Sequence, residues 1–181
     1  MESLAMQLAE LIQNSIEARA SEIEIFFNVN DYSNTITMKV SDNGLGMNDD
    51  FIKEVYNPFK TSRKSRNIGL GLAFLKQEVD QCDGKLIIDS KVNKGCSIEA
   101  IFKKDHLDLP QIGDLDTTIM CFMTEADRIN FSFIYQVNDK IFIFDTREIK
   151  KILGSEININ SNQVIVWIKD YLKHNMEGIE K

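Results

Sequence analysis

The sequence predicts an α+β fold. Apolar residues recur at helical spacing over residues 2–19, and no Gly or Pro interrupts them. Two segments of alternating apolar and polar residues follow at 22–29 and 35–41, with a turn cluster between them. The same two-strand pattern returns at 85–91 and 96–103, around an Asn-Lys-Gly turn. Helices combined with pairs of short strands are typical of this fold class.

Further helices are predicted between and after these strands. One covers residues 49–56, and another opens at 69–72 and ends before Gly84. Beyond a connecting segment at 105–113, we expect a helix over 114–126 and a hairpin of 130–137 with 140–144. Asp145 and Glu148 form a capping-box pattern for a helix that ends before Gly154, and a final amphipathic helix covers 161–174.

Composition limits the class of protein. The chain has 181 residues, of which 43% are apolar and 27% charged, with a formal net charge of −7. Three cysteines without CxxC spacing indicate neither a disulfide framework nor a structural zinc site. The sequence has no apolar run as long as a membrane span and no signal-peptide pattern, so we expect a cytoplasmic protein with no membrane role. The acidic balance and the shortness of its basic cluster argue against nucleic-acid binding.

The segment 57–71 concentrates positive charge. Lys60, Arg63, Lys64 and Arg66 stand just before the glycines of Gly69-Leu70-Gly71-Leu72 at the start of a predicted helix. Glycines allow close backbone approach, and a helix N-terminus offers free N–H groups and a partial positive charge. This pattern favours a polyanionic ligand. The alternative is a solvated loop followed by an ordinary capped helix.

Two other patterns indicate a site. The second strand ends in Asp42-Asn43-Gly44-Leu45-Gly46-Met47, which suits a tight turn that brings backbone near a ligand beside a carboxylate. Its alternative is a plain Asp-Asn-Gly turn. Glu10 and Asn14 are four residues apart and therefore share a face of the first helix, where both could instead be merely solvated.

Taken in order, these segments resemble the GHKL superfamily of ATP-binding domains (gyrase, heat-shock chaperone, histidine kinase and MutL) over residues 8–104. Residues 10–18 resemble its N-box, 42–47 its first glycine box and 69–72 its second, while 58–63 match the segment that opens the mobile ATP lid. The resemblance implies a Bergerat-type α/β sandwich, in which helices cover one face of a mixed, mainly antiparallel sheet. ATP is then expected between the helix layer and the lid.

The resemblance also implies roles for single residues. Glu10 would be the general base, and Asn14 would hold Mg²⁺ through its amide oxygen. Asp42 would accept a hydrogen bond from the adenine amine, with Met47 packed on the purine. Glycines of both boxes would admit the purine or donate N–H groups to phosphates, and a lid cation would reach the γ-phosphate. The implied nucleotide-binding residues are Asp42, Gly44, Gly46, Met47, Thr61, Arg63, Lys64, Arg66, Gly69, Leu70, Gly71 and Leu72.

Departures from the family pattern shape the expected function. Glu10, Ser15 and Glu17 look more like MutL or gyrase, whereas the short lid resembles kinases. No histidine lies in a phosphoacceptor box, so His106 and His174 are expected to be ordinary histidines. We therefore expect a short histidine-kinase-like protein that uses Mg²⁺ and ATP and transfers phosphate to a partner protein. The alternative is a slow ATPase or a nucleotide-gated binding switch, and Glu10 is compatible with both chemistries.

Residues 105–181 are not explained by these motifs. A segment this small is marginal by itself, so we expect an α+β appendage that packs on the ATP-binding domain of residues 1–104. It would bind a partner or support the lid, and the protein could also form a homodimer.

Either Cys96 or Ser97 stands where the family often has a threonine near the adenine.

Overall fold

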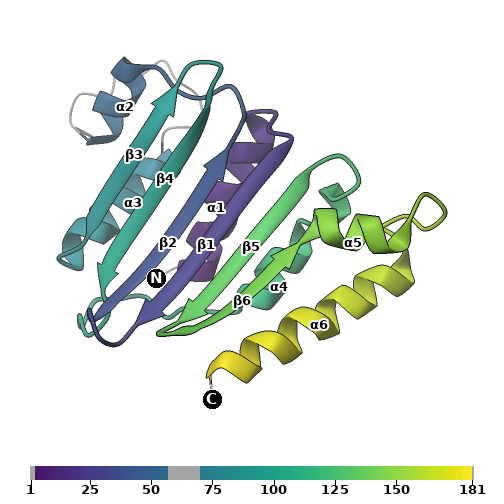
Figure 1. Ribbon diagram of the computed structural model, residues 1–181. Coiled ribbons are helices and arrows are strands. Elements are labelled where there is room, and N and C mark those ends of the chain that lie inside the picture. The colour runs from purple at the N-terminus through teal and green to yellow at the C-terminus, as the bar shows by residue number, and fades with distance from the viewer. Residues whose placement is uncertain (1–2, 57–69, 181) are drawn as a thin grey trace.

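The computed structural model describes residues 3–56 and 70–180, with Leu70 described by its backbone alone. The helices are α1 (Leu4–Glu17), α2 (Asp49–Tyr56), α3 (Leu70–Gln81), α4 (Leu115–Cys121), α5 (Thr146–Leu153) and α6 (Asn162–Glu180), and a 3₁₀ turn, η2, spans Met123–Glu125. The strands are β1 (Glu22–Asn30), β2 (Thr35–Asp42), β3 (Lys85–Lys91), β4 (Gly95–Lys103), β5 (Asn130–Val137) and β6 (Lys140–Asp145). Figure 1 shows their arrangement.

The described strands form one six-stranded sheet in the order β3-β4-β2-β1-β5-β6. Neighbouring strands are antiparallel, except that β5 runs parallel to β1, in a register from Glu22 opposite Asn130 to Val29 opposite Val137. The strands of residues 105–181 therefore continue the sheet of the preceding residues, as Figure 1 shows. The predicted mixed, mainly antiparallel sheet of an α+β fold is confirmed.

The two faces of the sheet differ in burial. One row across the sheet, formed by Leu86, Ala100, Met38, Phe27, Tyr135 and Phe142, is buried. Helices α1, α3, α4 and α6 cover this face (Figure 1). The neighbouring row, which points the other way, contains the half-buried Lys39, Phe26 and Ile134 and the exposed Ile143. Because side chains alternate along a strand, this difference follows from the alternation in the sequence.

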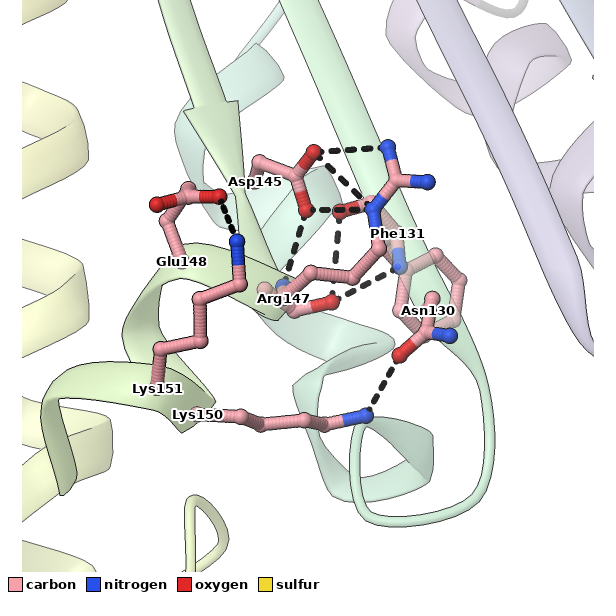
Figure 2. A network of polar contacts seen from close by, with 8 residues as sticks. Asn130, Phe131, Asp145, Arg147, Glu148, Lys150 and Lys151 are labelled. Atoms are coloured by element: carbon pink, nitrogen blue, oxygen red, sulfur yellow. Dashed lines mark hydrogen bonds and ion pairs between the residues drawn. The ribbon is translucent and has the colours of Figure 1, made fainter. Parts of the chain in front are cut away.

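Helix α5 is fastened to the start of β5 by the polar network of Figure 2. The Asp145 carboxylate caps the helix by accepting from the Arg147 backbone N–H at 2.8 Å. The guanidinium of Arg147 also hydrogen-bonds Asp145 and lowers the pKa of its carboxyl. Below it, Lys150 donates to Asn130 Oδ1 at 2.8 Å. The cap expected at Asp145 is therefore present, whereas the Glu148 carboxylate pairs with Lys151.

Most expected element boundaries lie within one or two residues of those in the structure. Two differ more. The helix expected over 114–126 ends at Cys121 and continues as the 3₁₀ turn η2. The last helix extends to Glu180, beyond the expected end at 174, because Met176 adds a further buried apolar residue to the stripe of Val164, Ile168 and Leu172.

Candidate functional site

A cavity of about 190 Å³ lies between α1, the loop after β2, α3 and β4. We name it the Asp42 cavity. Its walls are mainly apolar and carry a small number of polar groups, which is the usual construction of a small-molecule site. It is lined by Leu11, Asn14, Ser15, Glu17, Ala18, Asp42, Leu45, Gly46, Met47, Leu72, Cys96 and Ile98.

Both oxygens of the Asp42 carboxylate are fixed by the protein. The buried Ser15 hydroxyl donates to Oδ2 at 2.7 Å, and the Gly44 backbone N–H donates to Oδ1 at 2.8 Å. An ionised carboxylate has about four acceptor positions, so these two bonds leave others for a donor in the cavity. Asp42 is therefore oriented and still able to accept.

The loop after Asp42 packs tightly on its neighbours. The Leu45 N–H donates to the Ala18 carbonyl at 2.9 Å, and the Leu45 carbonyl accepts from the Asn93 N–H at 2.6 Å. A Cβ at Gly44 would lie 2.6 Å from the Ala18 oxygen, and one at Gly46, where φ is +63°, would lie 2.2 Å from the Lys91 oxygen. These glycines make room for the chain's own backbone. Their predicted role in admitting a purine stays a prediction.

Strand β4 supplies another wall through Cys96 and Ile98, and β3 holds the neighbouring backbone in place. Ser90 accepts from the Met47 N–H at 2.8 Å and donates to the Gly95 carbonyl at 2.9 Å, which fixes the backbone of the cavity-lining Met47. Cys96 lines the cavity, and burial raises the pKa of its thiol to about 11. Ser97 instead bonds Ser41 at 3.0 Å. Of the two residues expected near an adenine, Cys96 is the one that faces the cavity.

A second, smaller cavity lies between α1 and α3. We name this space of about 30 Å³ the Glu10 cavity; its lining residues are Gln7, Glu10, Leu11, Asn14, Gly71, Phe74, Leu75 and Glu78. Leu11 and Asn14 line both cavities, so the half-buried Asn14 stands between them. A Cβ at Gly71 would lie 2.8 Å from Glu10 Oε2. The structure thus brings Glu10, Asn14 and the start of α3 together.

Several predicted site residues lie outside the described part of the chain. These are Thr61, Arg63, Lys64, Arg66 and Gly69, together with the side chain of Leu70. Leu72 is buried and lines the Asp42 cavity. Sequence reasoning gave no role to Ser15 or Ser90, which orient Asp42 and the Met47 backbone. The feature of the sequence that could have indicated a role for Ser15 is its position next to Asn14 on the same helix.

A third cavity, of about 460 Å³, lies at the other end of the molecule between α4, α6 and Tyr135. Asp114, Asp116, Glu177 and Glu180 line it beside Lys173. None of its lining residues belongs to the motifs that the sequence analysis singled out. Among the described residues, no helix combines the length and hydropathy that crossing a membrane requires.

An ordered carboxylate thus borders two adjoining cavities beside the start of α3, and all of these elements lie within the part of the chain that a family model matches. The model of the histidine kinase-, DNA gyrase B- and HSP90-like ATPases matches residues 2–106. The chain belongs to this family, which is part of the GHKL superfamily.

Individual relatives match the same part of the chain. Sensor histidine kinase YvrG of Bacillus subtilis (strain 168) is 32% identical over 101 residues, covering 54% of this chain and 17% of the kinase. A putative sensor protein of Shewanella frigidimarina (strain NCIMB 400) is 30% identical over 103 residues, covering 56% of this chain and 16% of that protein. The chain thus spans about a sixth of the length of these relatives.

A solved structure extends the likeness of fold. The N-terminal domain of a DNA repair protein superposes with a TM-score of 0.57 at 19% identity and covers 86% of this chain and 58% of that chain. At this identity the match shows the fold alone. Its coverage exceeds that of the family model, so the shared architecture includes part of the sequence after residue 106.

Proposed function

We propose that this protein binds ATP with its adenine in the Asp42 cavity. The observation that carries the proposal is the Asp42 carboxylate, which two protein donors orient while acceptor positions remain for the cavity. The exocyclic amine of adenine is a donor, whereas guanine has an acceptor at that position, so an ionised carboxylate selects adenine. The apolar side chains of Leu11, Met47, Leu72 and Ile98 fit the faces of a purine.

The phosphates would lie toward the Glu10 cavity. The N-terminus of α3 offers N–H groups there, and Gly71 leaves its backbone uncovered by a side chain. Lys60, Arg63, Lys64 and Arg66 precede this helix in the sequence and would supply positive charge, since the described residues lining the Asp42 cavity include two carboxylates and no cation.

Asn14 is the residue that would hold Mg²⁺. It lies between the two cavities, and its amide oxygen is a hard donor of the kind this cation prefers. When bound, Mg²⁺ would supply positive charge against the negative charge that develops during transfer. The neighbouring Glu10 carboxylate adds negative potential that favours a cation at this point.

Glu10 would then act as the general base. The bond from the γ-phosphorus to the β,γ-bridging oxygen breaks, a new bond forms from an acceptor oxygen to phosphorus, and the acceptor's proton passes to Glu10. We propose that the acceptor is a side chain of a partner protein, reached in the cytoplasm. Residues 105–181, as an appendage to the domain of residues 1–104, would contact this partner or support the lid.

A second candidate uses the same site with water as acceptor, giving a slow ATPase or a nucleotide-gated switch. Glu10 favours it as strongly, because the residue can deprotonate water as well as a hydroxyl. Incubation with γ-labelled ATP, with and without co-purifying proteins, separates the two. Label on a protein supports phosphotransfer, and release of free phosphate alone supports hydrolysis.

The nucleotide site is tested by Asp42→Asn. The amide presents a donor where adenine also donates, so ATP affinity should fall by roughly 10- to 100-fold, or about 1–3 kcal/mol. Calorimetry measures the affinity, and circular dichroism verifies the fold. Asp49→Asn, on the exposed start of α2, is the matched control. An Asp42→Asn protein that is folded and binds ATP unchanged would refute the adenine assignment.

A further inference from the structure

Helices α1 and α3 are joined by a polar pair beside the Glu10 cavity. The Gln7 side-chain amide donates through Nε2 to Glu78 Oε2. Gln7 is 5% exposed, and its neighbours Leu4, Leu8 and Leu11 on α1 are buried apolar residues. A glutamine at such a position is unusual, because burial of an amide is unfavourable unless its groups are hydrogen-bonded.

The other end of the same amide is not satisfied. Gln7 Oε1 is buried and has no hydrogen-bond partner among the described residues. An unpaired buried acceptor is destabilising, and native structures contain few of them. The Glu78 carboxylate fixes which end of the Gln7 amide is nitrogen and which is oxygen. A carboxylate only accepts hydrogen bonds, so the NH₂ group of Gln7 must face it.

Gln7 and the proposed general base Glu10 both line the Glu10 cavity. Glu10 is one turn along the same helix, and its carboxylate lies over Gly71 on the facing helix. A space of about 30 Å³ can hold one water molecule when polar groups surround it. Gln7, Glu10, Asn14 and Glu78 supply those groups.

We propose that Gln7 and Glu78 are positioning residues for Glu10. Glu78 holds the Gln7 amide, and Gln7 Oε1 accepts one O–H of a water whose other O–H donates to the Glu10 carboxylate. The carboxylate is thereby held beside the start of α3, where the phosphates would lie. This assignment rests on the proposed function, because it gives Glu10 a task that needs a fixed geometry.

The test is the double variant Gln7→Leu with Glu78→Leu. Two leucines can pack between the helices without a buried polar atom, so Tm should rise by roughly 2–4 °C. Without the acceptor the Glu10 side chain is less restrained, and kcat should fall by roughly tenfold while the Kd for ATP stays unchanged. A merely structural pair predicts instead that Tm changes while kcat stays the same.

Two further variants sharpen the result. Gln7→Glu with Glu78→Gln reverses the pair: the donor moves to α3, an acceptor carboxylate stands on α1 at the cavity, and kcat should return to within about threefold of the original protein. Gln13→Leu changes an exposed glutamine on the same helix and should leave kcat unaltered. Rescue by the reversed pair together with loss in the leucine pair supports the assignment.

The outcomes distinguish this inference from the proposed function. If the original protein turns over ATP through Glu10 and the leucine pair does so at the same kcat, the positioning role is wrong and the proposed function stands. If the original protein shows no turnover that Glu10→Ala removes, the positioning role and the catalytic role of Glu10 are both wrong, and ATP binding is judged separately by Asp42→Asn. A leucine pair that loses ATP affinity along with kcat would overturn the positioning role in favour of a role in binding.

Discussion

The two halves of the sheet use the same buried face differently. Over β1 to β4, this face borders two cavities, where the small or polar residues Ser15, Asp42, Gly46 and Gly71 stand among apolar side chains. Over β5 and β6, aromatic rings fill it. Phe131, Phe133, Tyr135, Phe142 and Phe144 are buried, and Tyr171 of α6 packs on the last two with ring centroids 5.7 and 6.5 Å apart.

This contrast separates the site from the cluster of buried aromatic rings. Small and polar residues around a cavity contribute little hydrophobic free energy, whereas each buried aromatic ring removes a large apolar area from water. Because β5 pairs directly with β1, the aromatic half can support the half that carries the site. Changes in the first half should therefore affect ligand chemistry, and changes in the second should affect stability.

The largest expected effect is on turnover. Glu10 is exposed on α1, so Glu10→Ala should leave stability nearly unchanged while lowering kcat by roughly 10²–10⁴-fold, the usual share of a general base. Steady-state ATP turnover by purified protein and calorimetry of ATP binding measure the two quantities. Asn14→Ala should weaken Mg·ATP binding itself.

The control for Glu10→Ala is Glu177→Ala, an exposed glutamate in the aromatic half. It should turn over ATP normally. Full turnover by Glu10→Ala would mean that the base lies elsewhere, and a matching loss of ATP affinity would give Glu10 a binding role.

The converse experiment uses Phe133, which is fully buried on β5. Phe133→Ala should lower the free energy of unfolding by about 3–5 kcal/mol, through lost burial and the cavity left behind. Urea unfolding followed by fluorescence of Trp167, the single tryptophan, measures this loss. Ile134→Ala on the half-buried opposite face should cost clearly less, and equal losses would contradict the contrast between the faces.

Gly71→Ala should separate stability from chemistry within the first half. Alanine favours a helix over glycine by up to about 1 kcal/mol, so α3 should gain stability. The new Cβ would lie 2.8 Å from Glu10 Oε2, so the carboxylate must move, and kcat should fall by roughly 10- to 100-fold. Thermal unfolding and turnover assays on one preparation check that stability rises and that kcat falls. Unchanged kcat would show that the Glu10 position tolerates this shift.

The smallest expected effect is the pH dependence from Asp145. Hydrogen bonding to Arg147 lowers the pKa of this carboxyl in the folded protein. Its stabilisation is therefore fully present above the ordinary aspartate pKa of about 3.9 and is lost as pH falls through the lower folded value. Asp145→Asn keeps a capping side chain but should cost up to about 1 kcal/mol at neutral pH, because the half-exposed Arg147 is screened by solvent.

Urea unfolding at about pH 6 and about pH 2 measures that dependence. The difference between the Asp145→Asn and original proteins should shrink at the lower pH. A difference that stays constant would assign the effect to capping geometry rather than to charge.

The sequence predicted what depends on local pattern. Alternation in 22–29 and 35–41 was enough to place Phe27 and Met38 on the buried face, because side chains alternate with a period of two. It could not reveal that β5 pairs with β1, since alternation specifies which face is buried and not which strand lies alongside.

The same limit applies to the candidate site. Asp42, Asn14 and Glu10 belong to short motifs and could be selected by their spacing. The bond from Gln7 to Glu78 joins two helices, and each residue reads as an ordinary polar position in its own segment. Which of Cys96 and Ser97 faces the Asp42 cavity depends on the register of β4 against β2. In this register Cys96 lies opposite Asp42.

The parallel pairing of β1 with β5 also has a consequence for folding. During synthesis, β1 meets β2 at once through their hairpin, but its other edge has no partner until residues 130–137 have left the ribosome. Contacts between such distant segments form slowly, because a long loop must close first. Until then the N–H and C=O groups along one side of β1 can pair with strands of other chains. The nascent protein is therefore most prone to aggregate at its own central strand.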